Sequence, residues 1–507
     1  SMPKFYITNA IPYVNAEPHI GFALELIQSD TVARYQRLLG KDVRYLCGTD
    51  ENSLKNVQAA EAAGKPVREF VDEHAERFYR LKDALDLSFD DFIRTTEERH
   101  FRGAQALWNA CDQSDIYKKK YKGLYCVGCE LFYTEDELVD GLCPEHKKRP
   151  VSVEEENYFF RLSKFQKEIE EVIEKGYVKI FPEFRKDEVL QFVRNGLQDF
   201  SISRSEERAH GWGVPVPGDP DQIMYVWFDA LSNYITALGY GASDELYRRY
   251  WVQESEAKRE VAHVIGKGII RFHAVYWLGM LLSARIPLPT VEFVHGYITV
   301  GGEKMSKSLG NVLDPYSVVS SYGTDPFRYF MLGALSSYND GDFSDGRLQE
   351  FYTAHLANGI GNLTCRILTM LEKYSRSAVP AEASDSFDTA SFWQAYEKAM
   401  GEFRFDDAVK CIQSVVAVCD QTISDEKPWA KAKAGENIDA LLYQLAETLR
   451  HVAVALLPII PVSAEKILSQ LGISRSSVGT LGDEKQWGKL KEGVIIKKGE
   501  QLFPRLA

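Results

Sequence analysis

The pattern of apolar and polar residues near the N-terminus predicts a strand, a helix and a second strand. Residues 4–8 form a short strand-like run, and a loop with two prolines follows it. Apolar or weakly polar side chains then recur every three or four positions from Ile20 to Leu38, which gives a helix with one buried face that ends at Gly40. Residues 43–47 are typical of a buried strand, and Asp50 follows that strand closely. This order indicates a parallel α/β sheet of the nucleotide-binding kind, whose ligands bind at the carboxyl ends of the strands.

The periodicity changes further along the chain and predicts two additional kinds of structure. Residues 118–221 contain short strands and turns, which suggests a domain inserted into the sheet. Strand-like runs resume at residues 224–228, 261–266 and 291–300, and beyond residue 345 only helical periodicity continues, to about residue 472. We therefore expect an α/β fold in which a Rossmann-like parallel sheet is split by an insertion and is followed by an all-α helical bundle. The expected parts are the first half of the sheet domain at 1–117, the insertion at 118–221, the second half of the sheet domain at 222–300, a glycine-containing loop region at 301–350 and the helical domain at 351–507.

The composition is that of a globular protein with an acidic balance. The 507 residues include 73 acidic and 60 basic side chains, which gives a formal net charge of −13. This charge argues against indiscriminate binding to nucleic acid or to an anionic membrane, so any polyanion must be met by a local patch. The sequence contains no run of 18 apolar residues and no signal-peptide pattern at its N-terminus. We therefore expect a cytoplasmic protein with no membrane partner.

Three cysteines and one histidine have the spacing of a metal site. Cys126 and Cys129 form a C-x2-C knuckle, and after thirteen further residues Cys143 and His146 form a C-x2-H knuckle. The two knuckles can supply four ligands to one tetrahedral ion. Because protein side chains would fill all four positions, we expect one structural Zn²⁺ rather than a catalytic one. The alternative is that the four residues are unrelated surface side chains.

Two segments have the chemistry of a phosphate site. His19 and Gly21 open the first predicted helix, where free backbone N–H groups and the helix dipole favour phosphate. A histidine in this position is also common as a helix cap, so this segment alone is a weak indication. Residues 302–311 place Lys304 and Lys307 between serines and glycines, from which both side chains can reach a triphosphate. A pair of lysines on a loop can also be no more than a solvated charge run.

Together these segments resemble the two signature sequences of the class I aminoacyl-tRNA synthetases, HIGH at residues 19–22 and KMSKS at residues 304–308. Within that class the chain is similar to the methionyl-tRNA synthetase family, and the segments 10–13, 225–230 and 266–273 carry the similarity. The resemblance implies a methionine–tRNA ligase. Such an enzyme activates L-methionine with ATP and Mg²⁺ and then transfers it to tRNA(Met) for protein synthesis. The sheet domain would be catalytic, and the helical domain would bind the anticodon.

The resemblance also implies roles for individual residues. Asp50 would pair with the ammonium group of methionine. The walls of the methionine side-chain pocket would be Ala10, Ile11, Tyr13, Trp227, Ala230, Leu231, Tyr234, Ile269 and His273. The residues that bind ATP would be His19, Gly21, Lys304, Ser306 and Lys307, of which the histidine and the two lysines would be catalytic. The residues that bind the anticodon would be Asn362, Arg366 and Trp429.

Some of these residues also fit a simpler interpretation. Taken singly, Trp227 and Ile269 are typical of ordinary core packing, and a tryptophan after a proline, as at Trp429, is often a packing anchor. The four lysines within residues 118–122 either contact the tRNA backbone or form a solvated basic turn.

Three positions depart from the family's pattern. Phe22 replaces the second histidine of the first signature, and Gly268 replaces an acidic residue associated with the ribose of ATP. Asn52 and Ser53 stand where many members have histidine and glycine. These departures leave open a noncatalytic tRNA-binding paralogue, and a nucleotidyltransferase for a smaller substrate is a further alternative. We favour an active enzyme because Asp50 and both signature lysines are retained, and we expect a monomer.

Overall fold

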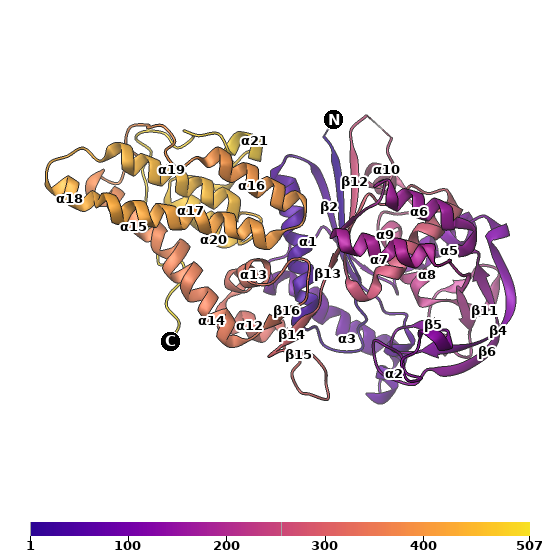
Figure 1. Ribbon diagram of the computed structural model, residues 1–507. Helices are drawn as coiled ribbons and strands as arrows, with labels where there is room; N and C mark the ends of the chain where they lie inside the picture. Colours follow the sequence, from indigo (N-terminus) through magenta and orange to yellow (C-terminus); the bar gives the residue numbers. More distant parts are fainter. Residues whose placement is uncertain (1, 255) are drawn as a thin grey trace. The chain divides into compact units, whose positions relative to one another are not determined.

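The computed structural model describes residues 2–254 and 256–507, and the chain divides into two compact units (Figure 1). The first unit comprises the residues up to Pro18, Val43–Asp83 and Phe89–His295. The second comprises His19–Asp42, Ala84–Ser88 and Gly296–Ala507. The chain therefore crosses between the units several times near its N-terminus.

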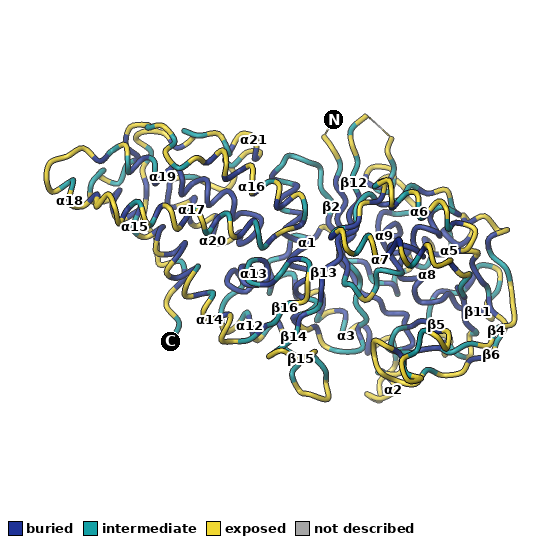
Figure 2. Tube along the Cα trace, viewed as in Figure 1, coloured by how far each residue is buried: buried dark blue, intermediate teal, exposed yellow. Residues whose placement is uncertain are grey.

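The first unit is built on a six-stranded sheet with the order β3-β2-β1-β12-β13-β7. These strands are β1 (Lys4–Asn9), β2 (Asp42–Thr49), β3 (Asp91–Arg94), β7 (Lys179–Phe181), β12 (Arg259–Gly266) and β13 (Val291–His295). The recorded pairings β2–β3, β1–β12, β12–β13 and β13–β7 are all parallel. The central strands are buried along most of their length and appear dark blue in Figure 2. Burial on both faces explains why they have continuous apolar runs rather than an alternating pattern.

Residues 118–221 form much of a second, antiparallel layer of the same unit. A four-stranded sheet has the order β5-β4-β6-β8, and a three-stranded sheet has the order β10-β11-β9. The strands of the larger sheet are β4 (Ile116–Cys126), β5 (Leu131–Tyr133), β6 (Val151–Phe160) and β8 (Phe200–Ser201), and those of the smaller are β9 (Ser203–Ser205), β10 (Pro215–Val216) and β11 (Asp219–Met224). The same segment also supplies β7, which pairs with β13 in the main sheet.

Helices dominate the second unit. The helices from α14 onward are α14 (Asp345–Phe351), a π-helical stretch Tyr352–Gly361, α15 (Asn362–Tyr374), α16 (Thr389–Gly401), α17 (Phe405–Glu426), α18 (Pro428–Lys433), α19 (Asp439–Leu456) and α20 (Pro461–Gln470). A small sheet with the order β15-β14-β16 precedes them, with β14 at Ile298–Val300, β15 at Glu303–Lys304 and β16 at Gly341–Phe343. The predicted fold class, a split Rossmann-like sheet with an insertion followed by a helical bundle, is confirmed.

The first helix, α1 (Ile20–Leu38), groups with the helical unit although it lies in the chain between β1 and β2. A buried ion pair fixes it there, because Asp30 on α1 lies 2.8 Å from a guanidinium nitrogen of Arg328 on α13 (Thr324–Gly333). Burial alone would raise the pKa of Asp30, but Arg328 and Arg34 hold it below its usual value. Arg328 also donates to the carbonyl oxygens of Ile459 and Pro458. These bonds satisfy a guanidinium that is fully buried.

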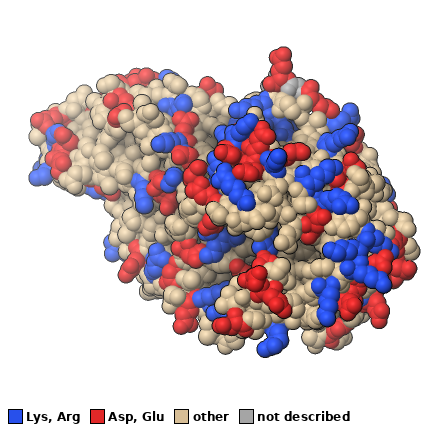
Figure 3. All heavy atoms as spheres, turned by 45° about the vertical axis from the view of Figure 1, so that its right-hand side comes forward, with Lys and Arg blue, Asp and Glu red and all other residues tan. Residues whose placement is uncertain are grey.

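Charged side chains are mixed on the surface. On the face drawn in Figure 3, lysines and arginines lie among aspartates and glutamates rather than in areas of a single sign. Among the described residues, no helix is both long and apolar enough to cross a membrane.

A buried carboxylate in the helical unit leads to a prediction about stability. Glu447 on α19 accepts hydrogen bonds from Arg450 and from the backbone N–H groups of Gly488 and Lys489. Burial opposes its ionisation, but hydrogen bonds from His451 and Arg450 lower its pKa to about 2. We expect Glu447→Gln to lower the free energy of unfolding by up to about 3 to 5 kcal/mol, because it removes the closer of the two carboxylates that pair with the buried Arg450 and leaves only Glu484. Denaturant titration at neutral pH measures this loss.

The same carboxylate predicts a loss of stability in acid. Because its pKa is lower in the folded than in the unfolded chain, its contribution is complete above pH 4.5 and disappears as the pH falls from there toward 2. The Glu447→Gln variant therefore has a weaker pH dependence in this range. Glu426→Gln is the control, since it removes an exposed ion pair with Lys431 and costs less than about 1 kcal/mol. Equal losses in the two variants would contradict the prediction.

Candidate functional site

The two predicted signatures lie together in the second unit. His19 caps α1, and its Nδ1 atom accepts a hydrogen bond of 3.0 Å from the backbone N–H of Gly21. The next residue, Ile20, donates its N–H to the carbonyl oxygen of Leu313, just beyond the second signature. A Cβ atom on Gly21 would lie 2.9 Å from Nδ1 of His19 and 3.3 Å from Cε of Met305. Glycine is therefore required where the first signature approaches the second.

The second signature is a preformed loop with its lysines at the surface. Asn311 holds the loop, since it accepts from the N–H of Ser306 at 2.8 Å and donates to the carbonyl oxygen of Lys304 at 3.1 Å. The side chains of Lys304 and Lys307 are exposed. In the first signature, acceptance at Nδ1 leaves the proton of a neutral His19 ring on Nε2, where it can be donated to a ligand.

All ten predicted methionine-pocket residues lie in the first unit. Residues 10–13 follow β1, and Asp50 follows β2. The backbone N–H of Asp50 donates to the carbonyl oxygen of Pro12 at 2.8 Å, which joins these two strand ends. The remaining members lie on α8 (Val226–Leu231), on α9 (Asn233–Thr236), on the 3₁₀ turn Lys267–Ile269 and on the π-helical stretch Phe272–Tyr276. Ala10, Ile11, Tyr13 and Ile269 all pack against the same core cluster as Trp227, Ala230, Leu231 and Tyr234.

The aromatic members contact one another directly. The hydroxyl group of Tyr234 lies 2.6 Å from Nε2 of His273, whose Nδ1 lies 3.1 Å from the carbonyl oxygen of Ile269. The ring of Trp227 meets the His273 ring edge-on, with 6.1 Å between their centroids. Burial lowers the pKa of His273 to about 4, so its imidazole is neutral at physiological pH. This side of the pocket is therefore aromatic and uncharged.

Asp50 is a buried acid that forms no ion pair among the described residues, although Lys55 attracts it electrostatically. Only 1% of the residue is exposed, and its Oδ1 atom has no hydrogen-bond partner among the described residues. Burial raises the pKa of Asp50 well above its usual value, and the nearby carboxylates of Asp229 and Glu130 raise it further. A bound cation would relieve both effects, because it would restore an electrostatic partner for the ionised form.

A buried polar network lies behind the pocket, and the sequence analysis did not nominate its members. Asn52 donates to Asp229 at 2.9 Å, and the other oxygen of Asp229 lies 2.5 Å from Nε2 of His100. Ser53 donates to Glu130 at 2.5 Å. The departures Asn52 and Ser53 are thus built into hydrogen bonds that connect the Asp50 segment to α8 and to the start of β5. Periodicity alone gives no sign of these long-range pairs.

Phe272 is a further residue that the prediction missed. Its ring stacks on Trp227 with 3.9 Å between centroids and an interplanar angle of 5°. Phe272 belongs to the segment 266–273 that carries the family resemblance. Its position next to the predicted pocket residue His273 could therefore have indicated that it also contributes to the pocket.

The four predicted metal ligands converge. The candidate ligand atoms of Cys126, Cys129, Cys143 and His146 all lie within 4.8 Å of one another. The Sγ atom of Cys129 lies 3.1 Å from Sγ of Cys143 and 3.2 Å from Nδ1 of His146. A Cβ on Gly128 would lie 2.8 Å from Cγ of the His146 ring, so glycine is needed for this close approach. Three thiols and one imidazole in this arrangement could hold a metal ion.

The predicted anticodon residues lie on two helices of the second unit. Asn362 and Arg366 are four positions apart on α15 and share one helix face. Arg366 is joined to Asp420 on α17 by an ion pair of 3.2 Å. Trp429 lies at the start of α18 and is 44% exposed, which leaves much of its ring available to a ligand.

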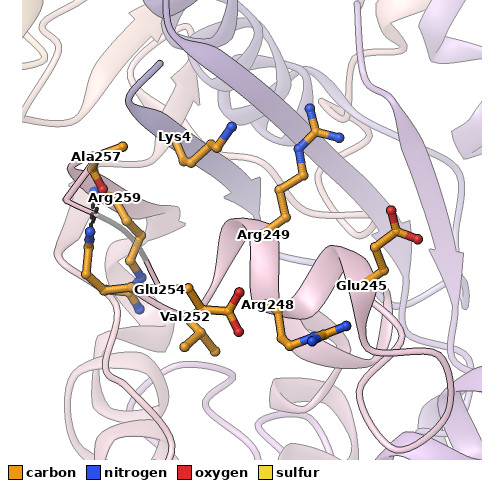
Figure 4. Close-up of a pocket in the computed structure, with 9 residues that line it drawn as sticks. Lys4, Glu245, Arg248, Arg249, Val252, Glu254, Ala257 and Arg259 are labelled. Atoms are coloured by element: carbon orange, nitrogen blue, oxygen red, sulfur yellow. Dashed lines mark hydrogen bonds between the residues drawn. The ribbon is translucent and has the colours of Figure 1, made fainter. Parts of the chain in front are cut away.

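A surface pocket of about 340 Å³ near the start of β1 is not part of this site. Figure 4 shows its lining, in which Lys4, Arg248, Arg249 and Arg259 lie around two glutamates. Lys4 and Arg259 are the first residues of β1 and β12. The pocket therefore lies at the amino ends of these strands, whereas ligands of parallel sheets bind at the carboxyl ends.

Comparisons with known proteins agree with this arrangement. The family model described as tRNA synthetases class I (M) matches residues 5–150 and 146–368, and the anticodon-binding domain of tRNA ligase matches residues 388–494. A methionine–tRNA ligase of Thermotoga maritima is 41% identical over 99% of this chain and 80% of that protein. A methionine–tRNA ligase of Brucella suis is 42% identical over 100% of this chain and 98% of that protein.

A solved structure extends the similarity to three dimensions. The methionyl-tRNA synthetase of Mycobacterium tuberculosis, in complex with methionyl-adenylate, matches with a TM-score of 0.92 at 38% identity. The match covers 99% of this chain and 100% of that chain. The signatures, the pocket and these similarities together show that the chain belongs to the methionine–tRNA ligase family of the class I tRNA synthetases.

Proposed function

We propose that the chain activates L-methionine with ATP and transfers it to tRNA(Met) by means of the residues described above. A carboxylate oxygen of methionine attacks the α-phosphorus of ATP, pyrophosphate leaves, and methionyl-adenylate forms. A hydroxyl group of the terminal ribose of the tRNA then attacks the methionyl carbonyl carbon, and AMP leaves. The observation that carries the proposal is the buried carboxyl group of Asp50, whose Oδ1 atom has no hydrogen-bond partner among the described residues, beside the aromatic side chains of the pocket.

The pocket suits methionine for two physical reasons. The ammonium group of the substrate supplies a charged hydrogen-bond donor to the unpartnered Oδ1 atom of Asp50. The thioether is flexible and polarisable, and gains from contact with rings such as those of Trp227 and Tyr234. The uncharged His273 keeps that part of the pocket free of a charge that would have to be desolvated.

The signatures supply the chemistry of phosphate. The N-terminus of α1 and the Nε2–H group of His19 stabilise the negative charge on the α-phosphate during the displacement. Lys304 and Lys307, with Ser306 on the same loop, neutralise charge on the departing pyrophosphate. Mg²⁺ accompanies ATP and would share that task. Asn311 keeps the loop in shape.

The helical unit offers groups that can recognise the anticodon. Unpaired bases of an RNA loop are bound by stacking on aromatic rings and by hydrogen bonds from amide and guanidinium groups. Trp429 supplies an exposed ring, and Asn362 and Arg366 supply donors. Trp429 falls within the match to the anticodon-binding model, whereas Asn362 and Arg366 precede it.

A noncatalytic tRNA-binding paralogue and a smaller-substrate nucleotidyltransferase are not favoured. The similarity to methionine–tRNA ligases extends over the whole chain, including both signatures and the helical unit. The monomeric state and the cytoplasmic location stay predictions.

The reaction is tested by methionine-dependent exchange of labelled pyrophosphate into ATP, with the variant Asp50→Asn. We expect the wild type to catalyse exchange with methionine and not with other amino acids. The variant should raise KM for methionine by about 100-fold, because it removes a buried charge partner of the ammonium. Asp136→Asn, which changes an exposed acid of the same unit, is the control and should leave KM unchanged. Absence of exchange in the wild type would overturn the proposal.

The raised pKa of Asp50 predicts a pH dependence of methionine binding. The ammonium group binds the ionised carboxylate, so affinity is complete above the pKa of Asp50 and is lost as the pH falls through it. The KM for methionine should therefore rise as the pH is lowered, and should begin to rise at a higher pH than an ordinary aspartate would cause, while KM of the Asp50→Asn variant stays flat. Parallel profiles for the two proteins would contradict this assignment.

The tight packing at Gly21 predicts the effect of one added methyl group. In Gly21→Ala the new Cβ would displace the ring of His19. We expect kcat for exchange to fall by about 10- to 100-fold, with KM for methionine unchanged, because one donor to the phosphate is moved. Gly346→Ala is the matched control, since a Cβ there meets no atom within 4 Å. Equal kcat values for the two variants would show that the position of the His19 ring does not matter for the reaction.

We further propose that the cysteine–histidine cluster holds one structural zinc ion. Atomic spectroscopy should find one zinc per chain, and Cys143→Ser should lose it together with several degrees of thermal stability, since metal binding contributes to local folding. Cys365→Ser, which changes an exposed cysteine of the other unit, should retain the metal. Zinc loss in both variants, or in neither, would rule out the assignment.

A further inference from the structure

The first unit contains a second cavity, of about 610 Å³, that the proposed reaction does not use. We refer to it as the aromatic cleft. Its walls include β4 of the antiparallel layer, the loop before β8 and the π-helical stretch Phe272–Tyr276. The residues that matter for the argument are Tyr117, Lys119, Tyr121, Phe132, Arg271 and Tyr276.

The lysine run of β4 is divided between two faces. Side chains alternate along a strand, and Tyr117, Lys119 and Tyr121 are the members that line the cleft. Lys118 faces the other way, where it lies 3.3 Å from Asp219. Lys120 and Lys122 share that outer face by the same alternation. Lys119 thus lines the cleft between two tyrosines. If the lysine run were only a solvated turn, we would not expect one of its members to line a cavity.

The rings of the cleft form a surface suited to a flat ligand. Tyr121 lies 5.1 Å from the ring of Phe132 and 5.3 Å from that of Phe159, and Tyr117, Tyr121 and Phe132 all remain partly exposed. Two further lining residues, Phe200 and Tyr276, stack with 4.0 Å between their ring centroids. Aromatic surfaces of this kind stack nucleobases with little regard to sequence.

Charges of both signs border these rings, since Glu137 and Asp199 line the cleft together with Lys119 and Arg271. The Nζ atom of Lys119 lies 5.4 Å from the centre of the Phe159 ring, and Lys119 forms no ion pair among the described residues. Arg271 lies over the ring of Phe192 at 4.6 Å and pairs with Glu137. In a chain with a net charge of −13, an unpaired lysine between rings favours a ligand that carries phosphate.

Two segments that line the cleft also contain residues of the predicted methionine pocket. Arg271 and Tyr276 line the cleft, and Phe272 and His273 lie between them in the chain and belong to the pocket side. Tyr225 also lines the cleft, two residues before Trp227. A ligand in the cleft is therefore held beside the place where methionine is activated.

We infer that the aromatic cleft binds an unpaired nucleotide near the 3′ end of the tRNA, with its base stacked against Tyr121 and Phe132 and its phosphate at Lys119. This inference rests on the proposed function, because only a tRNA ligase brings an unpaired RNA end to the amino-acid pocket. The occupant is RNA rather than a free nucleotide. A single lysine neutralises too little of the charge of a free triphosphate to bind it, whereas a polynucleotide gains affinity from further phosphate contacts elsewhere on the protein.

The first test separates the tRNA step from activation. In the full chain, Lys119→Ala/Tyr121→Leu should leave methionine-dependent pyrophosphate exchange within about twofold of the wild type. It should lower kcat/KM for tRNA in aminoacylation by at least about tenfold, because stacking and a phosphate contact are lost. Lys120→Ala/Lys122→Ala, which removes two lysines from the outer face of the same strand, is the matched control and should keep at least half of the wild-type value. Tyr121→Phe, which retains the ring, should do the same.

The second test reports the base directly. 2-Aminopurine placed at an unpaired 3′ position of the tRNA loses fluorescence when it stacks. We expect quenching with the wild type and with Tyr121→Phe, and loss of quenching with Tyr121→Leu at tRNA concentrations that still saturate the protein. A tRNA that lacks its unpaired 3′ nucleotides should bind the wild type more weakly than intact tRNA, and should bind the double variant equally well.

Three outcomes would overturn the inference. The first is wild-type aminoacylation by Lys119→Ala/Tyr121→Leu, and the second is unchanged quenching with Tyr121→Leu. The third is inhibition by free AMP that depends on Lys119 without any effect on tRNA, which would identify a nucleotide site instead. Absence of pyrophosphate exchange in the wild type would be a separate result, since it would reject the proposed function itself.

Discussion

The methionine pocket depends on how four consecutive buried polar residues at the end of β2 are paired. Glu51 meets Arg94 at 2.7 Å, Asn52 bonds to Asp229, and Ser53 bonds to Glu130. Of the two acids in this segment, only Asp50 has a carboxyl oxygen without a hydrogen-bond partner among the described residues, and it lies near two other acids. The amide oxygen of Asn52 is also without such a partner. Removing a charge from water costs several kcal/mol unless a partner replaces the water. The charge of Glu51 is therefore paired within the fold, whereas Asp50 is left to the ammonium group of the proposed substrate.

This pairing gives a physical meaning to the two residues that depart from the family pattern. Asn52 can donate through its amide to Asp229, which also contacts His100, so that one carboxylate joins the Asp50 segment to the helix that carries Trp227. The hydroxyl group of Ser53 and the N–H of Leu54 both donate to the buried Glu130. Each substitution thus supplies a donor to an acid that is nearly or completely excluded from solvent. Asn52 and Ser53 therefore change the hydrogen bonds that hold the Asp50 segment in place, and not the side chains that would contact methionine.

Local patterns predicted those parts of the molecule that depend on neighbouring residues. The strands before Asp50, the helical periodicity beyond residue 345 and the spacing of Cys126 to His146 all reflect short-range rules, and the structure contains each of them. These short-range patterns do not predict which residues pair across long distances in the chain. The grouping of α1 with the helical unit follows from the ion pair of Asp30 with Arg328, which lie almost 300 positions apart in the chain. Strand β7 is only three residues long, and its place in the main sheet depends on its pairing with the distant β13. The stack of Phe272 on Trp227 likewise needs two segments that only folding brings together.

Hydrogen-bond directions within the pocket explain how it can favour a thioether. Nδ1 of His273 lies beside the carbonyl oxygen of Ile269, so the proton of the neutral ring is on Nδ1 and Nε2 is an acceptor. The hydroxyl group of Tyr234 must then donate to Nε2, and its proton is not available to a ligand. A substrate with a strong acceptor in its side chain would find no donor at this histidine–tyrosine pair, and would lose its bonds to water there. A thioether is only a weak acceptor and loses little. The buried Tyr234–His273 pair therefore uses its own donor internally and offers none to a bound side chain, which agrees with the proposed thioether ligand.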